Sequence, residues 1–374
     1  FLKIGLCGFT CSILLKYFNK KDKYIILFSC IYALLSYNLL YYLNYMWFGS
    51  VIMLPLVVLG IEKLINERKK LLYFITLTLS ILFNFYIGYM ICIFSVIYFV
   101  YKYITLKKIK RDKKIIKDFI ILSVLAGLVC PVFLIPVIFQ LLNGKNTGFS
   151  QTNQTEYFLF SMDWFNAFYK ITIGSFRSVD ISYGSPNIYS SLFIVSLVLT
   201  VFFNTKISLK EKIVVGCILA FYLLSFSFNL IDYSWHMFQR PIWYPNRYSF
   251  TLSLFLIIIA YKSFNNIKNI KFNNWVLVAL IYLMIMMVTS GIYNEIFENK
   301  GKILLLALSI LLVIDYIFIL FFKKYFKVLL IIFIVIELTL NSYVTIKAIP
   351  HNTSVNYFTN EIYYFNKQIK VLEN

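Results

Sequence analysis

Long, nearly uninterrupted runs of apolar residues recur along this chain, and they constrain its fold more than any other feature. Ile303–Phe322 is one such run and Phe326–Ile346 is another. A helix of about 20 apolar residues can cross the roughly 30 Å hydrocarbon layer of a bilayer. A helix also satisfies its own backbone hydrogen bonds, which lipid cannot do. Because the runs do not alternate polar and apolar residues, they predict an all-α, polytopic transmembrane bundle rather than membrane strands.

Composition supports this class and excludes a partner that the charge would otherwise suggest. Hydrophobic residues make up 60% of the 374 positions, whereas soluble domains contain about 45–50%. The net charge of +20 would point to nucleic acid in a soluble protein. Here the basic residues lie in short loops between apolar runs, as in cytoplasmic loops of membrane proteins. We therefore expect a lipid bilayer and no nucleic acid as partners.

The apolar runs amount to about twelve hydrophobic segments. We assign residues 1–349 to one transmembrane domain and residues 350–374 to the start of an extracellular region, and we expect the chain to be a fragment truncated at both ends. The predicted segments are Phe1–Phe18, Tyr24–Leu43, Val51–Ile65, two within Leu71–Tyr101, Phe119–Leu142, Tyr189–Phe203, Ile213–Leu230, Tyr248–Phe264, Trp275–Tyr293, Ile303–Phe322 and Phe326–Ile346.

The stretch Leu71–Tyr101 decides the topology, because it can be one long span or two short helices. A single span would distribute Lys and Arg equally between the two sides of the membrane. A fold at Asn84–Gly88 instead gathers most of them on one side, as cytoplasmic loops require. We therefore predict a short helical hairpin at 71–101. Its halves of about 15 residues are short for full spans, so a partly re-entrant hairpin is also consistent.

This topology places two polar loops, 143–188 and 231–247, on the outer side. The first contains Asp163 and Asp180, which are candidate catalytic carboxylates or metal ligands; the alternative is a pair of solvated loop carboxylates, and the sequence does not choose between them. Tyr183 and Asn187 flank a Gly-Ser-Pro turn and are candidates to line an outer cavity.

The second loop carries two arginines on the side where basic residues are unusual. A guanidinium group binds phosphate through two parallel hydrogen bonds, so Arg240 and Arg247 are candidate ligands of a lipid phosphate. The alternative is arginines that extend to anionic headgroups. His236, one of 2 histidines, is a third candidate for the phosphate or a structural residue. Trp235 is expected among the aromatic residues of the membrane interface.

Further candidates lie in the first outer loop and within the apolar runs. Asn44 and Trp47 could line the outer cavity or belong to an ordinary interfacial loop. Asp315 and Glu337 are deep carboxylates, which are costly in a membrane, but two groups are too few to form a proton relay. Glu62 is expected to pair with the adjacent Lys63 at the surface.

An ordered set of short motifs resembles the YfhO family of bacterial membrane proteins. Each motif is weak alone, but together they cover nearly the whole chain. They are Asn44-Tyr45-Met46-Trp47, Leu54-Pro55-Leu56, Leu59-Gly60-Ile61-Glu62, Asn84-Phe85-Tyr86-Ile87-Gly88-Tyr89-Met90, Gly184-Ser185-Pro186-Asn187-Ile188-Tyr189, Trp235-His236-Met237-Phe238, Pro245-Asn246-Arg247-Tyr248-Ser249-Phe250 and Glu337-Leu338-Thr339-Leu340-Asn341.

The resemblance implies a fold like that of the GT-C class of polytopic glycosyltransferases. Members of the family are implicated in glycosylating cell-wall polymers such as lipoteichoic acid. The implied donor is a sugar on a polyprenyl phosphate, used at the outer face. Such enzymes carry their catalytic Asp in a large outer loop that would precede Phe1. The chain departs from the family pattern at Phe48-Gly49, where an acidic residue is expected.

These expectations lead to one main hypothesis and two alternatives. The main hypothesis is the membrane core of a glycosyltransferase that transfers sugar from a polyprenyl-phosphate lipid to an extracellular cell-wall polymer in a bacterial cell membrane. The alternatives are a transporter or lipid flippase, and an inactive fragment that lacks the catalytic loop. No cofactor is required by the residues, and the need for a divalent metal stays open.

Overall fold

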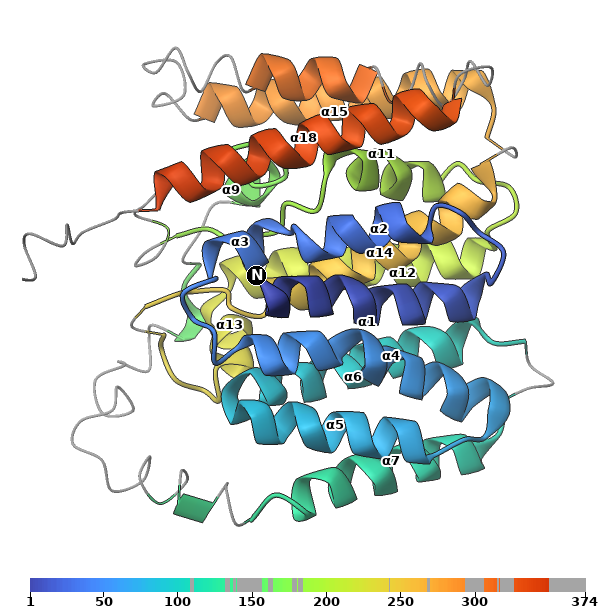
Figure 1. Cartoon of the computed structure of the whole chain (residues 1–374), viewed down its shortest axis with the longest axis vertical. Coiled ribbons are helices and arrows are strands. Elements are labelled where there is room, and N and C mark those ends of the chain that lie inside the picture. The colour runs from blue at the N-terminus through green and yellow to red at the C-terminus, as the bar shows by residue number, and fades with distance from the viewer. Residues whose placement is uncertain are drawn as a thin grey trace, which may run out of the picture.

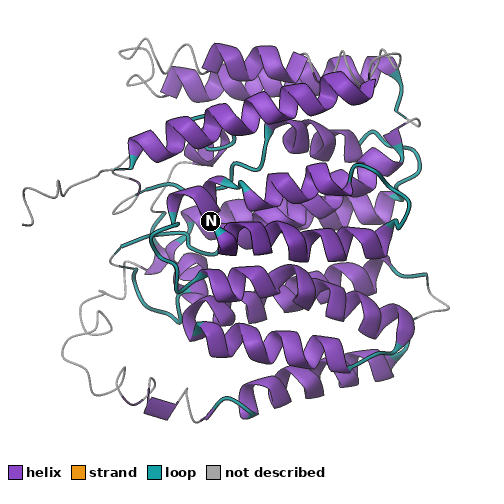
Figure 2. Cartoon of the chain, in the orientation of Figure 1, coloured by secondary structure: helices purple, strands orange, loops and turns teal. Residues whose placement is uncertain are grey.

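The chain folds into a bundle of helices lying side by side (Figures 1 and 2). The computed structural model describes residues 1–107, 111–131, 135–136, 139, 157–160, 164–176, 180, 184–241, 243–267, 270–292, 306–314, 316 and 326–349. Across these residues all regular elements are helices, and one isolated β-bridge joins Phe160 to Phe228. The predicted all-α class is confirmed.

Fourteen helices have defined bounds in these ranges. They are α1 (Leu2–Phe18), α2 (Ile25–Ala33), α3 (Ser36–Leu40), α4 (Phe48–Glu67), α5 (Leu71–Phe83), α6 (Phe85–Thr105), α7 (Lys113–Leu128), α9 (Trp164–Tyr169), α11 (Leu192–Val201), α12 (Leu209–Ser227), α13 (Asn229–Trp235), α14 (Ser249–Asn265), α15 (Phe272–Ile292) and α18 (Phe326–Ala348).

Three of the helices described have the length and apolar composition to cross a membrane: α4, α6 and the Val328–Ala348 part of α18. Shorter apolar helices accompany them: Ile25–Leu40, Leu71–Phe83, Leu192–Val201, Ser249–Asn265 and Asn273–Ile285. The described helices thus support a membrane protein, with fewer clear spans than the twelve predicted segments.

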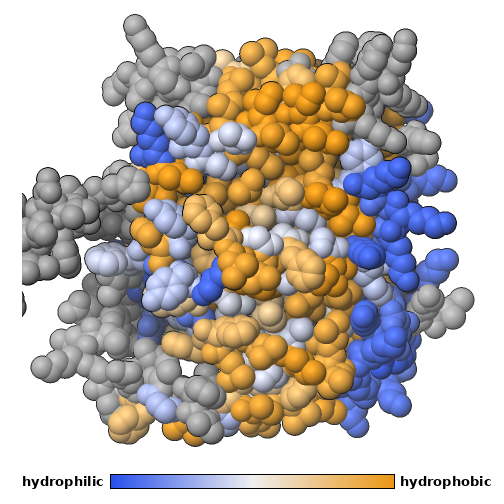
Figure 3. Space-filling model, in the orientation of Figure 1, coloured by the Kyte–Doolittle hydropathy of each residue, from blue (hydrophilic) through white to orange (hydrophobic). Residues whose placement is uncertain are grey.

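The two ends of the bundle differ in chemistry. The connections α1–α2, α4–α5, α6–α7, α11–α12 and α14–α15 meet at one end, on the right in Figure 1. Figure 3 shows hydrophilic residues gathered there, beside a broad apolar belt. We call this the basic end. Its loops carry Lys20, Lys21, Lys23, Arg68, Lys69, Lys70, Lys107, Arg111, Lys206 and Lys271.

The opposite end is formed by the α3–α4 loop, the α5–α6 break and the α13–α14 loop (Figure 1). We call it the aromatic end, because rings from these loops cluster there. Lys3, near the start of α1, donates to the carbonyl oxygen of Tyr45 at 2.8 Å. This contact ties the beginning of the bundle to the α3–α4 loop.

The predicted hairpin is present, with its break at Asn84. This residue is extended (φ −160°, ψ 111°), and its side chain accepts from the backbone N–H of Ile87 at 2.9 Å, which caps α6. The two helices approach closely, since a Cβ added to Gly88 would lie 2.7 Å from the Cα of Ile81. The second helix is longer than predicted: α6 has 21 residues and ends at Thr105.

The predicted segment Tyr189–Phe203 is helical only from Leu192. Residues 184–190 before it are not helical, and Ser191, the N-cap, adopts a left-handed φ of 80°. Non-helical backbone inside a membrane bundle must find its hydrogen-bond partners within the protein. Glu337 on α18 supplies an acceptor, because its carboxylate receives the backbone N–H of Leu192 at 2.6 Å.

The Glu337 carboxylate also accepts from three hydroxyl groups. Tyr189 donates at 2.6 Å, Ser191 donates at 3.0 Å, and Tyr316 donates as well. One turn further on, the side chain of Asn341 accepts from the Gly174 N–H at 3.1 Å. One face of α18 is thereby fixed to the bundle by polar contacts.

The other face of α18 is apolar and exposed. Val328, Ile331, Ile332, Val335 and Ile336 all project from it. A helix that buries a carboxylate on one side and exposes branched aliphatic residues on the other fits a lipid environment, in which lipid-facing residues are apolar and ionisable residues face the bundle interior.

Candidate functional site

The α13–α14 loop at the aromatic end departs most from regular backbone. Met237, Phe238, Tyr244 and Asn246 all have φ between 55° and 59°. Left-handed conformations of non-glycine residues cost of order 1 kcal/mol or more each and gather at functional sites. Asn246 tolerates this conformation better than most residues, and its side chain donates to the Gly184 carbonyl oxygen at 3.4 Å. The loop therefore holds a conformation that its local sequence does not favour.

Arg247 lies at the centre of this region, against three aromatic rings. Its guanidinium carbon lies 4.8 Å from the ring centre of Tyr86, 5.5 Å from Trp47 and 5.8 Å from Tyr244. Two of its N–H groups donate to backbone carbonyl oxygens, those of Tyr244 at 2.9 Å and Trp243 at 2.5 Å. Within the described ranges no carboxylate forms an ion pair with Arg247. The side chain is half-buried, and these two hydrogen bonds fix its orientation. Its positive charge is not neutralised by a carboxylate of the described residues.

Tyr41 joins two further predicted residues to this cluster. Its ring lies edge-on to Trp47 at 5.3 Å and to Tyr244 at 5.5 Å, measured between ring centres. Its hydroxyl oxygen accepts from the side chain of Asn187 at 2.9 Å. The structure thus brings Trp47, Asn187 and Arg247 together around Tyr41 and Tyr244.

His236 lies next to the arginine cluster and is fully buried. Its Nδ1 is 2.6 Å from the Tyr86 hydroxyl oxygen, and its Nε2 is 3.5 Å from Oδ1 of Asp232. Neither Nε2 nor that carboxylate oxygen has a hydrogen-bond partner among the residues the structure describes. Buried polar atoms without partners are rare and point to a function or a bound group. Asp232, His236 and Tyr86 form a short row of titratable groups ending beside Arg247.

Trp235 corrects one sequence expectation. It is not an interfacial residue: its ring is fully buried and stacks on Tyr248 at 4.5 Å between ring centres, nearly parallel. Tyr222 stacks on the same indole at 5.7 Å. This stack fixes the end of α13, and so sets the position of His236, which follows directly in the chain. Trp243, by contrast, is exposed.

Tyr86 is the site residue that sequence reasoning missed. It contacts both Arg247 and His236, although it lies 150 residues from the latter in the chain. Its motif indicated only the break between α5 and α6. The available signal was the position of Tyr86 directly after that break, which places its side chain at the end of the bundle where the α13–α14 loop lies.

The remaining candidates lie elsewhere or outside the described residues. Asp180 is buried and forms an ion pair with the buried Lys170, so it is not a solvated loop carboxylate. Arg240 is exposed, and Asn44 is half-buried in the turn before α4. Asp163, Tyr183 and Asp315 lie outside the residues that the structure describes.

The chemistry available at this site is anion binding and proton transfer. Arg247 can present free N–H groups to an oxyanion, and the Asp232–His236–Tyr86 row can hold or pass a proton. No group of three or more His, Cys, Asp or Glu side chains in the described part of the chain is arranged to hold a metal ion.

The family is decided by comparison of the whole chain. The family model described as "Bacterial membrane protein YfhO" matches residues 1–373. The chain belongs to the YfhO family. The motifs that suggested this membership include the residues of the cluster: Trp47, Tyr86, Asn187, His236 and Arg247. The chain is thus a member of a family of bacterial membrane proteins.

A curated member of the YfhO family is also similar to this chain. It is the "Uncharacterized protein YfhO" of Bacillus subtilis (strain 168), which is 22% identical over 240 residues. The match covers 64% of this chain and 25% of that protein, so the matched region spans about a quarter of the relative's length. No solved structure matches the chain.

Proposed function

We propose that this chain is the membrane core of a glycosyltransferase that moves a sugar from a polyprenyl-phosphate lipid donor to an extracellular cell-wall polymer such as lipoteichoic acid. Membership of the YfhO family of bacterial membrane proteins and the all-α bundle with apolar helices support the proposal. The observation that carries it is Arg247, a half-buried cation held over three rings with no carboxylate partner among the described residues. Binding of an anionic ligand would stabilise a half-buried cation that has no carboxylate partner.

In this proposal the aromatic end is the extracellular end. The basic loops at the other end are then cytoplasmic, as the positive-inside rule requires. The twelve-segment topology and the extracellular site follow from the same assignment. A polyprenyl phosphate, which has a long apolar tail and an anionic head, would lie with its tail along the apolar belt and its phosphate at Arg247.

The reaction would make use of Arg247 when the donor bond breaks. An acceptor hydroxyl oxygen bonds to the anomeric carbon, its proton passes to a base, and the bond from the anomeric carbon to the phosphate oxygen breaks. The released polyprenyl phosphate carries one more negative charge than the phosphodiester donor. A fixed cation at that oxygen stabilises the charge as it develops.

The other residues of the cluster would position the donor. His236, whose Nδ1 faces the Tyr86 hydroxyl and whose Nε2 faces Asp232, would hold Tyr86 beside the phosphate. Trp47 and Asn187 would line the sugar side. Asp180 is engaged by Lys170 and is less suited to act as a free base.

The transporter hypothesis has less support. It requires polar groups that face one another across an accessible path at mid-membrane. Of Asp315 and Glu337, the carboxylates predicted to lie deep in the membrane, the structure describes Glu337, which is enclosed by four donors. This arrangement suits a structural anchor better than a binding site for a transported ion.

The test measures sugar transfer from undecaprenyl-phosphate sugars in membranes that contain the full-length protein. Arg247→Ala should lower the transfer rate roughly 100-fold or more, as loss of a donor to a developing oxyanion does. Arg247→Lys keeps the charge but not the planar fork, and should give an intermediate rate.

Arg68→Ala is the matched control. Arg68 lies at the basic end, is 44% exposed and pairs with Asp112, so its loss should leave transfer unchanged. Transfer by Arg247→Ala at the wild-type rate would remove the arginine from the mechanism. Absence of transfer in the wild type with every undecaprenyl-phosphate sugar tested would refute the proposed activity itself.

A further inference from the structure

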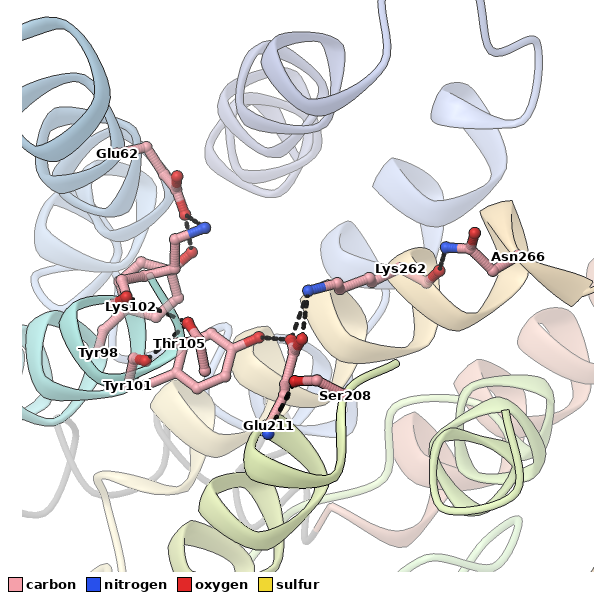
Figure 4. A network of polar contacts seen from close by, with 9 residues as sticks. All are labelled: Glu62, Tyr98, Tyr101, Lys102, Thr105, Ser208, Glu211, Lys262 and Asn266. Carbon is pink, nitrogen blue, oxygen red and sulfur yellow. Dashed lines mark hydrogen bonds and ion pairs between the residues drawn. The ribbon is translucent and has the colours of Figure 1, made fainter. Parts of the chain in front are cut away.

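A second polar site lies at the basic end, inside the bundle and away from Arg247. A cavity of about 220 Å³ opens there between α4, α6 and α14. Figure 4 shows polar side chains from α4, α6, α12 and α14 converging in this region. The cavity is lined by Phe18, Glu62, Tyr98, Tyr101, Lys102, Ile258, Tyr261, Lys262, Asn265 and Asn266.

One side of the cavity is built on Glu62 of α4. Lys102 forms an ion pair with its carboxylate at 2.9 Å, and the Tyr98 hydroxyl donates to the same oxygen at 2.5 Å. The pairing with Lys63 expected from the sequence is therefore wrong. The physical reason is depth: Glu62 is 1% exposed, and a buried carboxylate needs donors from the neighbouring helix.

The other side repeats this arrangement on α12. Glu211 accepts from Lys262 of α14 at 2.5 Å and 2.7 Å, and the Tyr101 hydroxyl donates to it at 2.5 Å. Figure 4 shows both ion pairs in one view. Each carboxylate therefore holds one lysine, and the two lysines lie on the wall of a single cavity.

The lysines are more accessible than the carboxylates. The side chains of Lys102 and Lys262 are 23% and 45% exposed, whereas those of Glu62 and Glu211 are 1% and 8% exposed. A group entering the cavity therefore meets two ammonium groups first. An ammonium group has three N–H donors, so each lysine can hold its carboxylate and still donate to a ligand.

Tyr261 provides an independent sign of a ligand. It lines the cavity and is 1% exposed, and its hydroxyl, which lies near the side chains of Asp22 and Asn265, forms no hydrogen bond of normal geometry with a described residue. A buried hydroxyl without a partner costs about 1–3 kcal/mol in general. An acceptor atom of a bound group in the cavity would remove this cost.

We propose that this cavity binds a phosphate group, held by Lys102 and Lys262 with the Tyr261 hydroxyl as a further donor. Its volume lies below the roughly 300–1,000 Å³ of pockets for drug-sized ligands, which fits a small phosphate ester and not a nucleotide. Glu211 does not line the cavity, and Glu62, which does, is neutralised by Lys102, which disfavours a cationic ligand. The source is either the headgroup of an anionic phospholipid in the adjoining leaflet or a soluble phosphate ester.

Native mass spectrometry of the detergent-solubilised chain tests the proposal with three probes. Dioctanoyl phosphatidylglycerol carries the phosphate on a lipid, glycerol 3-phosphate carries it without acyl chains, and dioctanoylglycerol has the chains without phosphate. We expect phosphatidylglycerol to bind and dioctanoylglycerol not to bind. Binding of glycerol 3-phosphate as well identifies a soluble ester as the source, and its absence identifies the lipid headgroup.

Two variants localise the binding. Tyr261→Phe removes only the hydroxyl oxygen and should weaken binding roughly two- to tenfold, the worth of one hydrogen bond. The double variant Lys262→Gln with Glu211→Gln keeps the net charge and leaves no unpaired carboxylate. It should weaken binding about tenfold or more, because a hydrogen bond from a charged donor is lost.

Lys69→Gln is the control, since Lys69 is an exposed lysine of the same end that pairs with Glu67. The proposal is overturned if neither phosphate probe binds, if dioctanoylglycerol binds as tightly as phosphatidylglycerol, or if both cavity variants bind like the wild type. None of these measurements depends on sugar transfer, so this result and that of the proposed function are independent.

Discussion

Replacement of Glu337 by leucine should destabilise the bundle strongly, because one carboxylate satisfies four buried donors. Those donors are the backbone N–H of Leu192 and the hydroxyls of Tyr189, Ser191 and Tyr316. Each donor left without an acceptor costs about 1–3 kcal/mol, which gives about 4–12 kcal/mol in total. Removing the carboxylate itself recovers several kcal/mol of desolvation. We therefore expect a net loss of about 3–5 kcal/mol for Glu337→Leu.

The free energy of unfolding can be measured by titrating the purified chain in mixed micelles with a denaturing detergent. Glu337→Gln retains a carbonyl oxygen that can accept two of the four hydrogen bonds, and should lose about 1–2 kcal/mol. Thr339→Leu is the matched control, since it replaces a polar residue by leucine on the exposed face of the same helix. A loss below about 1 kcal/mol for Glu337→Leu would refute the reasoning that this carboxylate holds residues 184–191 in place.

Two further predictions concern helix packing and the aromatic-end site. Gly60→Ala should lower the free energy of unfolding by about 1–3 kcal/mol, because a Cβ there would lie 2.5 Å from the Cα of Tyr73. Gly127→Ala is the control: nothing lies within 4 Å of a Cβ at that position, so the same assay should show a gain of about 0.5–1 kcal/mol. Tyr86→Phe removes the partner of the buried His236 Nδ1 and should lower sugar transfer roughly two- to tenfold while lowering the free energy of unfolding by about 1–3 kcal/mol. An unchanged transfer rate would separate Tyr86 from the donor site.

The sequence predicted the elements that depend on local physics. The break at Asn84 was predictable because one topology gathers the basic residues on one side, and an asparagine can cap the next helix. The ends of α1 and α14 fall within one residue of the predicted segments, because the apolar runs are bounded by polar residues. Arg247 was predictable as unusual because the predicted topology puts it on the side of the membrane where basic residues are rare.

The sequence could not predict which distant side chains meet. Trp235 was expected at the interface because tryptophan commonly lies there, but its ring stacks on Tyr248, a contact set by the turn between α13 and α14. Tyr86 joined the site through α6, and Glu62 found its lysine on α6 rather than beside it in the chain. Hydrophobic periodicity records which face of a helix is buried, and it contains no information on the helix that covers it.

The abundance of tyrosine, 30 of 374 residues, acquires a physical meaning from these contacts. Each of the buried carboxylates Glu62, Glu211 and Glu337 accepts from at least one tyrosine hydroxyl. A phenol packs as an apolar ring and still supplies an O–H donor, so it can hold a carboxylate inside an apolar bundle. At Glu337 the donors are hydroxyls and one backbone N–H.

The same contacts separate the structural carboxylate from those of the basic-end cavity. Among the residues described, Glu337 has no ion-pair partner, and its four donors are directed at the carboxylate itself. Glu62 and Glu211 each hold a lysine as well, and a lysine has more N–H groups than one carboxylate contact uses. Lys102 and Lys262, which line the cavity, therefore keep N–H groups that can donate to a ligand in it. The lysines, which Glu337 lacks, are what distinguish the proposed phosphate site at the basic-end cavity from an anchor.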